Sequence, residues 1–232
     1  MLENINLSME GMSSLIYLQE VIANNLANVN TVGFKRERFF PEVLSDASIQ
    51  AETNCKEITI FDQGPLRETK NSLDIAIEGE GFFTIQTPEG IRYTRNGSFK
   101  LNFMGQLVMD ENALVMGESG PIDVTGEITV NGRGEIYQKG EMIDRLRIVT
   151  FERPYPIKKA GYNLFVPEED QVDEITVENA RIMQGFVEES NVEPIKEMVN
   201  ILSLFRFFEA GQKMLTTYDE MLDKSANDIG RV

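Results

Sequence analysis

Histidine and tryptophan are absent from the 232-residue sequence, and cysteine occurs once. Without histidine, the chain lacks the commonest general base and the commonest metal ligand. The single cysteine, Cys55, can form neither an internal disulfide nor a cysteine-based zinc site. We therefore expect no metal, no cofactor and no catalytic residue in this protein.

Positive charge is also scarce, with 22 lysine and arginine residues against 38 aspartate and glutamate residues and a net charge of -16. Phosphate groups repel a chain this acidic, so we expect no binding to nucleic acid. The sequence has no run of about 18 apolar residues, which predicts that it does not insert into a membrane. The N-terminal stretch contains Glu3 and Glu10 and lacks a basic leader, so we expect no cleaved signal peptide.

The two ends of the chain show helical periodicity, with apolar residues at alternating spacings of three and four. The N-terminal seam consists of Leu2, Ile5, Met9, Met12, Ile16, Gln19, Ala23 and Leu26. The C-terminal seam consists of Met198, Ile201, Phe205, Phe208, Gln212, Leu215, Asp219, Leu222, Ala226 and Ile229. Asn191 is predicted to cap the second helix, and Pro194 fits its first turn.

The middle of the chain predicts strands, because short β-prone runs alternate with turn residues and no helical pattern lies between them. Such runs are 73–77, 82–85, 91–94 and 146–149, and Thr87–Gly90 predicts a hairpin turn. The sequence thus predicts an α+β fold in which long N- and C-terminal helices form a coiled-coil domain. The expected divisions are residues 1–32 with 191–232 for that domain, 33–72 for an extended connector, and 73–190 for a mostly antiparallel β domain.

Phe205, Phe207 and Phe208 are so close in sequence that their side chains point around most of the circumference of the second helix. One partner helix cannot cover all three, and uncovered apolar surface on this scale indicates an interaction site. We therefore expect an oligomer held by contacts between helices.

Asparagine is concentrated in the segment 24–36, NNLANVNTVGFKR. The end of a helix accounts for part of this pattern, because asparagine and Gly33 tolerate the left-handed conformation found there. It does not account for all four asparagines. Asn24 and Asn28 lie four residues apart on one helical face, where side-chain amides can bind neighbouring chains and fix their register.

The segment 24–36 resembles the signature of bacterial flagellar rod and hook proteins. Residues 74–83, followed by 93–99 and 105–108, resemble the central β domain of the rod proteins. Residues 190–192, 197–199, 208–210, 219–222 and 226–227 resemble their C-terminal helix. The three motifs occur in the family's order and cover nearly the whole chain.

The resemblance implies a structural subunit of the flagellar basal-body rod, with an inner layer of terminal helices and an outer β domain. It implies helical assembly with other rod subunits, torque transmission from motor to hook, and export by the flagellar type III apparatus into the periplasm-spanning rod. The residues expected at subunit interfaces are Asn24, Asn25, Leu26, Asn28, Gly33, Phe34, Met198, Ile201, Leu202, Phe205, Phe208, Leu215 and Leu222.

The FlgF type, found in the proximal rod, is favoured over the FlgG type of the distal rod. The sequence lacks a long glycine- and serine-rich stretch after Arg36, and Glu118–Ile122 is more similar to the FlgF type. A FlgG-like distal rod protein and a generic exported coiled-coil scaffold stay open as alternatives. A glycosidase using Asp74, Glu78 and Glu80 is a further alternative, but acids in such a turn are usually solvated, so we expect no enzyme.

Overall fold

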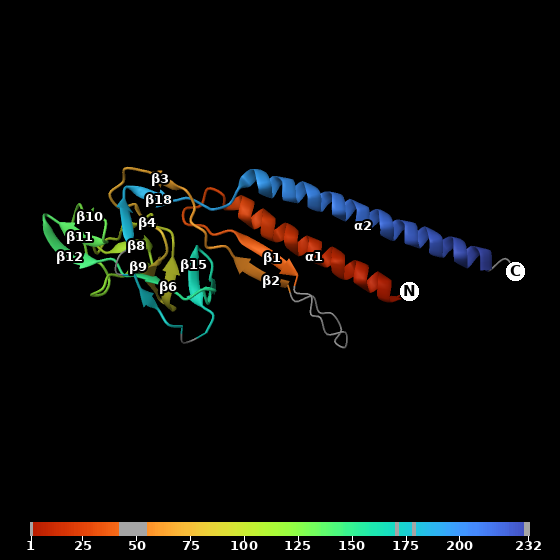
Figure 1. Cartoon of the computed structure of the whole chain (residues 1–232), viewed down its shortest axis with the longest axis horizontal. Helices are drawn as coiled ribbons and strands as arrows, with labels where there is room; N and C mark the ends of the chain where they lie inside the picture. Colours follow the sequence, from red (N-terminus) through yellow and green to blue (C-terminus); the bar gives the residue numbers. More distant parts are fainter. Residues whose placement is uncertain (1, 42–54, 170–171, 178–179, 230–232) are drawn as a thin grey trace. The chain divides into compact units, whose positions relative to one another are not determined.

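A computed structural model describes residues 2–41, 55–169, 172–177 and 180–229 of the chain (Figure 1). These residues divide into two compact units. Unit 1 contains residues 1–27, 37–58 and 193–232, and unit 2 contains residues 28–36 and 59–192. The predicted division into a terminal helical domain, a connector and a β domain stays a prediction, because compactness alone does not show which segments fold independently.

Unit 1 combines two helices with a small sheet. Helix α1 (Leu2–Ala27) packs against both α2 (Pro194–Ile229) and strand β1 (Glu37–Pro41), which pairs with β2 (Cys55–Thr59). The two helices, red and blue in Figure 1, lie side by side. Val21 and Ile22 of α1 and Leu204 of α2 are buried. The first turn of α2 contains Glu197, whose negative charge suits the positive end of the helix dipole.

Unit 2 is built on a nine-stranded sheet that contains the path β14-β15-β6-β5-β9-β8-β7, with β13 pairing both β5 and β16. Its strands are β5 (Phe82–Thr87), β6 (Gly90–Thr94), β7 (Lys100–Leu101), β8 (Leu107–Asp110), β9 (Ala113–Val115), β13 (Ile148–Thr150), β14 (Ile157–Lys159), β15 (Leu164–Pro167) and β16 (Ile175–Thr176). Antiparallel β5 and β6 pair from Phe83–Thr94 to Thr87–Gly90, which confirms the predicted hairpin.

Three smaller sheets complete the strands of unit 2. One contains β10 (Thr129–Val130), β11 (Glu135–Gln138) and β12 (Glu141–Arg145). In the other two, β4 (Ile75–Glu78) pairs with β17 (Arg181–Gln184), and β3 (Leu66–Glu68) pairs with β18 (Phe186–Glu188). Each pairing joins segments distant in sequence, so residues 181–188 are fixed against residues 66–78.

Strand β5 has apolar cores on both of its faces. Phe82 belongs to one cluster of buried side chains, with Tyr93 and Phe165, whereas Phe83 and Ile85 belong to the other. Successive side chains of a strand point to opposite faces, so a short run with apolar residues on both faces is the pattern of a strand buried on both sides. The run Phe82–Ile85 therefore places β5 at the centre of unit 2.

The predicted α+β class with a coiled-coil domain is wrong. The described residues form a mostly β structure of eighteen strands, with one helix at each end of the chain. The predicted seam is largely uncovered, since Ile16 and Phe205 are each 49% exposed. Periodicity reveals an apolar stripe but not what covers it, and α1 divides its packing between α2 and β1.

Tyr93 provides a test of the core cluster that it forms with Phe82 and Phe165. Its hydroxyl donates to Glu174 Oε1 at 2.6 Å, and Arg147 pairs with Glu174 Oε2 at 2.6 Å. Burial, with help from the bond to Glu174, raises the pKa of the Tyr93 phenol above its usual range. Above pH 10 the unfolded phenol therefore loses its proton while the folded phenol keeps it, so stability falls as pH rises.

We expect the stability advantage of the wild type over Tyr93→Phe to be complete below about pH 10 and to shrink above it. The slope should approach about 1.4 kcal/mol per pH unit. Urea unfolding of both proteins between pH 9 and 11.5 measures this difference. A difference that stayed constant across that range would contradict the assignment.

Candidate functional site

Asn25 is buried at the end of α1, with 1% of its surface exposed. Its Nδ2 donates to the carbonyl oxygen of Glu37 at 2.8 Å, and its Oδ1 accepts from the amide of Glu37 at 2.9 Å. One side chain thus satisfies both backbone groups of the first β1 residue, as a neighbouring strand would. Asn24 is exposed and Asn28 is half-buried, so the buried amide at the helix end is Asn25.

The segment after α1 turns sharply within unit 2. Thr31 donates from its amide to the carbonyl of Asn28 at 3.1 Å and from its hydroxyl to Asn28 Oδ1 at 3.2 Å. Gly33 has a φ of +69°, and a Cβ there would lie 2.4 Å from the amide nitrogen of Asn96. Only glycine fits that position, and its own amide donates to the carbonyl of Glu188 at 2.7 Å.

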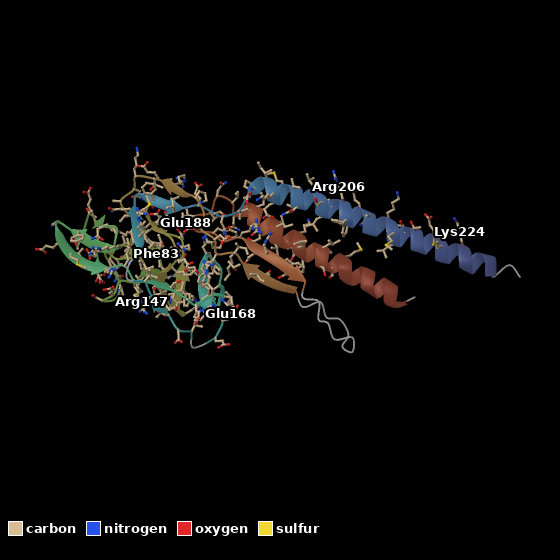
Figure 2. All side chains as sticks on the ribbon, in the orientation of Figure 1. Phe83, Arg147, Glu168, Glu188, Arg206 and Lys224 are labelled. Carbon is tan, nitrogen blue, oxygen red and sulfur yellow. The ribbon has the colours of Figure 1, made fainter. Side chains whose placement is uncertain are left out.

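Directly after this turn lies a cluster of three buried charges. Lys35 Nζ lies 2.5 Å from Glu188 Oε1, and Arg95 Nη1 lies 3.3 Å from Glu188 Oε2. Lys35 also donates to the carbonyl of Asp62 at 2.7 Å, and the amide of Gly64 donates to Glu188 Oε1 at 2.9 Å. Figure 2 labels Glu188 and shows its side chain among those of the β strands.

Burial governs the electrostatics of this charge cluster, which consists of Lys35, Arg95 and Glu188. Desolvation lowers the pKa of Lys35 and of Arg95, and the negative charge of Glu188 opposes the effect at both. Arginine does not give up its proton in proteins, and Arg95 donates further to the carbonyl of Gly79 at 2.6 Å. The cluster is therefore a structural junction in which each charge has a partner.

Asn191 joins two backbone segments instead of capping the second helix. Its Oδ1 accepts from the amide of Arg36 at 2.7 Å, and its Nδ2 donates to the carbonyls of Ile60 and Asp62 at 2.8 and 3.0 Å. Helix α2 begins three residues later, at Pro194. The predicted cap is wrong, because the side chain is bonded to the backbone of Arg36, Ile60 and Asp62.

The carboxylates weighed as glycosidase residues each have a separate structural partner. Asp74 accepts from the hydroxyl of Ser98 at 3.1 Å. Glu78 pairs with Arg181 at 3.2 Å, and Glu80 pairs with Arg153 at 2.6 Å. Within the described ranges no group of three histidine, cysteine, aspartate or glutamate residues could hold a metal, and no helix is long and apolar enough to cross a membrane.

Helix α2 exposes much of the predicted contact stripe. Phe205 is 49% exposed, Met198 53% and Leu202 60%, while half-buried side chains on the same helix are Ile201, Phe208 and Leu215. Figure 2 shows side chains projecting along this helix between Arg206 and Lys224. The side chain of Leu222 lies outside the described part of the structure.

Besides Asn25, two predicted contact residues are covered within the chain. Phe34 is 4% exposed, and Lys159 Nζ lies 3.9 Å from the centre of its ring. Gly33 is buried by its approach to Asn96, and Leu26 is half-buried. The segment 24–36 therefore shows two kinds of position, buried ones that hold the chain's own fold and exposed ones such as Asn24.

Sequence analysis singled out Phe207 but missed other apolar side chains that α2 exposes, which are Ile195, Met214 and Met221. They fall outside the seam, and only their apolar character could have drawn attention to them. It also missed the charge cluster, whose members are separated by up to 153 residues and share no local pattern.

Comparison with known proteins places the chain in a family. Residues 5–35 match the family described as "Flagella basal body rod protein", residues 76–138 match "Flagellar hook protein FlgE/F/G D1 domain", and residues 183–229 match "Flagellar basal body rod FlgEFG protein C-terminal". The flagellar basal-body rod protein FlgG of Buchnera aphidicola from Schizaphis graminum is 32% identical, over 97% of this chain and 98% of that protein. The chain belongs to the flagellar basal-body rod protein family.

Other relatives carry both type names. FlgF of Caulobacter vibrioides is 31% identical over 92% of each chain, and FlgG of Bacillus subtilis is 31% identical over 98% of this chain and 99% of the relative. The family resemblance is confirmed, while the identities do not separate FlgF from FlgG. The protein is a structural subunit of the flagellar basal-body rod, assembles with other basal-body components and is not an enzyme.

The charge cluster draws one residue from each matched segment of this rod protein. Lys35 ends the first segment, Arg95 lies within the second and Glu188 lies within the third. We expect Glu188→Gln to destabilise the fold by about 3–5 kcal/mol, because two buried cations lose their counter-charge. Urea unfolding of the purified chain measures the change.

The neighbouring Glu189→Gln is the matched control. Glu189 forms an ion pair with Arg67 at 2.6 Å, but both side chains are about half exposed. Exposed pairs contribute roughly 0–1 kcal/mol, so this variant should unfold almost like the wild type. Equal losses of unfolding free energy in the two variants would show that the buried charge cluster stabilises the fold no more than the exposed ion pair does.

Proposed function

We propose that this rod subunit contacts other subunits through the face of α2 that exposes Met198, Leu202 and Phe205, and that copies assemble helically to transmit torque from motor to hook. The observation that carries the proposal is the exposure of Met198, Leu202 and Phe205 along one helix. Uncovered apolar side chains in a row favour association, and a head-to-tail contact that does not close generates a helical filament.

The proposed contact set keeps the residues inferred from the sequence. It comprises Asn24, Asn25, Leu26, Asn28, Gly33, Phe34, Met198, Ile201, Leu202, Phe205, Phe208, Leu215 and Leu222. In this proposal the exposed positions touch neighbouring subunits. The buried ones, Asn25, Gly33 and Phe34, shape the backbone that presents them.

We further propose that the chain is of the FlgF type and belongs to the proximal rod. Alignments with FlgG relatives extend over 238–264 residues, more than the 232 residues of this chain. Alignments with FlgF relatives extend over 226 and 217 residues. The FlgG relatives thus contain residues without a counterpart here, which supports the FlgF type.

Export of the chain through the flagellar type III apparatus, without a cleaved signal peptide, is part of the same proposal. The similarity of the chain to flagellar basal-body rod proteins supports this route. The net charge of -16 favours separate subunits before assembly, since like charges repel at long range.

The α2 contact is tested by Phe205→Asp. A carboxylate in place of a partly exposed ring should reduce incorporation into rods and swimming motility more than tenfold, because burying an unpaired charge at an interface is costly. Quantifying the chain in isolated basal bodies measures incorporation. Circular dichroism of the purified variant should show that the strands remain folded.

Ser203→Asp is the matched control for that variant. Ser203 is exposed, and two residues along a helix correspond to a rotation of about 200°, so the same charge is placed on the opposite side of α2. Incorporation close to that of the wild type is expected. Motile cells with normal rods that contain Phe205→Asp would rule out this contact.

The proximal position is tested by imaging basal bodies from a strain that lacks this chain. Loss of a proximal subunit should leave a short rod that stops before the distal part, because each subunit is added onto those already in place. A rod that is complete except for its distal segment would instead identify the chain as FlgG-like.

A further inference from the structure

The hairpin between β7 and β8 ends in two exposed apolar side chains. Phe103 is fully exposed to solvent, and Met104 is 84% exposed. We call these two residues the tip. A phenylalanine ring carries roughly 150–250 Å² of surface, so the tip keeps a large apolar area in water. In a subunit of an assembly, such an exposed apolar projection indicates a contact with another protein surface.

The turn that holds the tip is firmly bonded. Asn102 Oδ1 accepts from the amides of Met104 and Gln106, both at 2.9 Å. Gly105 has a φ of +80°, its amide donates to the carbonyl of Asn102 at 3.0 Å, and its carbonyl accepts from Val124 at 2.6 Å. The tip is therefore pre-organised, which lowers the entropy lost when it binds.

Unit 2 also contains a groove, with a volume of about 340 Å³. We define the groove by its apolar lining residues, which are Pro88, Met109, Ala113, Ala160, Tyr162 and Leu164. The rest of its lining is polar and consists of Thr87, Glu89, Arg92, Asp110 and Asn112. Tyr162 is 91% exposed, and the next residue, Asn163, donates from Nδ2 to the carbonyl of Val32 at 3.0 Å. The groove thus has a partly apolar lining and an anchored aromatic residue at its edge.

A chain cannot place its tip in its own groove. Met104 precedes β8, whereas Met109 and Asp110 occupy its last two positions. Five residues of strand span roughly 16 Å, and β8 lies between β7 and β9, with which it pairs. The tip and the groove therefore lie at opposite ends of the same strand, and each needs a partner from another chain.

We propose that the tip of one copy inserts into the groove of the next copy in the rod. The inference rests on the proposed assembly of copies and adds a contact made by unit 2. Charge supports a second copy as the occupant, because exposed Lys100 adjoins the tip while Asp110 borders the groove, where Glu89 is already paired with Arg92 at 3.1 Å. Each contact joins two different surfaces, so the arrangement is head-to-tail and can extend into a helical filament.

Cysteine cross-linking in assembled rods tests the contact. In a Cys55→Ser background, the double variant Phe103→Cys and Tyr162→Cys is produced in cells that lack the wild-type chain. Treating isolated basal bodies with a short bismaleimide should give dimers and higher multiples of the chain. Each single variant, and Phe103→Cys combined with Glu127→Cys outside the groove, should stay monomeric.

The outcomes separate this inference from the proposed function. Rods that contain the double variant but give no cross-linked multiples would overturn the tip contact and leave the rod assignment intact. A product with the mass of another rod protein would also overturn it, because the occupant would not be a copy. Absence of the Cys55→Ser chain from rods would instead contradict the proposed assembly.

Charge exchange gives a second, independent readout. Lys100→Asp should lower incorporation into rods at least fivefold by placing two acids at the contact. Combining it with Asp110→Lys should restore at least half of the wild-type level, because the pair is rebuilt with reversed signs. Failure of the second change to restore incorporation would contradict the proposed pairing.

Discussion

The burial of three charges at one point is the constraint on which unit 2 depends. Taking Lys35, Arg95 and Glu188 out of water costs several kcal/mol for each ion, and the cost is offset only when all the partners are in place. The three residues come from the beginning, the middle and the end of the chain. Residues 28–36 therefore cannot leave the β structure without exposing a buried carboxylate or stranding a buried cation.

The surrounding backbone strengthens this junction. Gly33 approaches Asn96 too closely for any side chain, and its amide bonds to Glu188. Asn191 bridges the amide of Arg36 and the carbonyls of Ile60 and Asp62. Charge, close packing and amide bonds thus hold the same short segment, and such a stiff segment suits the torque-bearing role that we propose.

Much of the fold follows from local patterns in the sequence. Spacings of three and four indicate helix at each end of the chain, and Thr87–Gly90 indicates the hairpin of β5 and β6. The coiled coil was wrong because a stripe of apolar residues does not identify its cover, and part of that stripe, including Phe205, is exposed. In the candidate site, the segment 24–36 stands out by composition, but the choice of Asn25 as the buried amide depends on where β1 lies. The pairing of Lys35 with Glu188 depends on the whole topology and has no local signal.

The most direct test of the central claim is native-state hydrogen exchange of the amides of Gly33 and Gly64. Both donate to Glu188, one to its carbonyl and the other to its carboxylate. If the charge cluster ties the three segments into one cooperative structure, both amides should exchange only by global unfolding, with the same free energy as the amide of Thr84 in β5. Exchange of Gly33 through a local opening of much lower free energy would contradict the account.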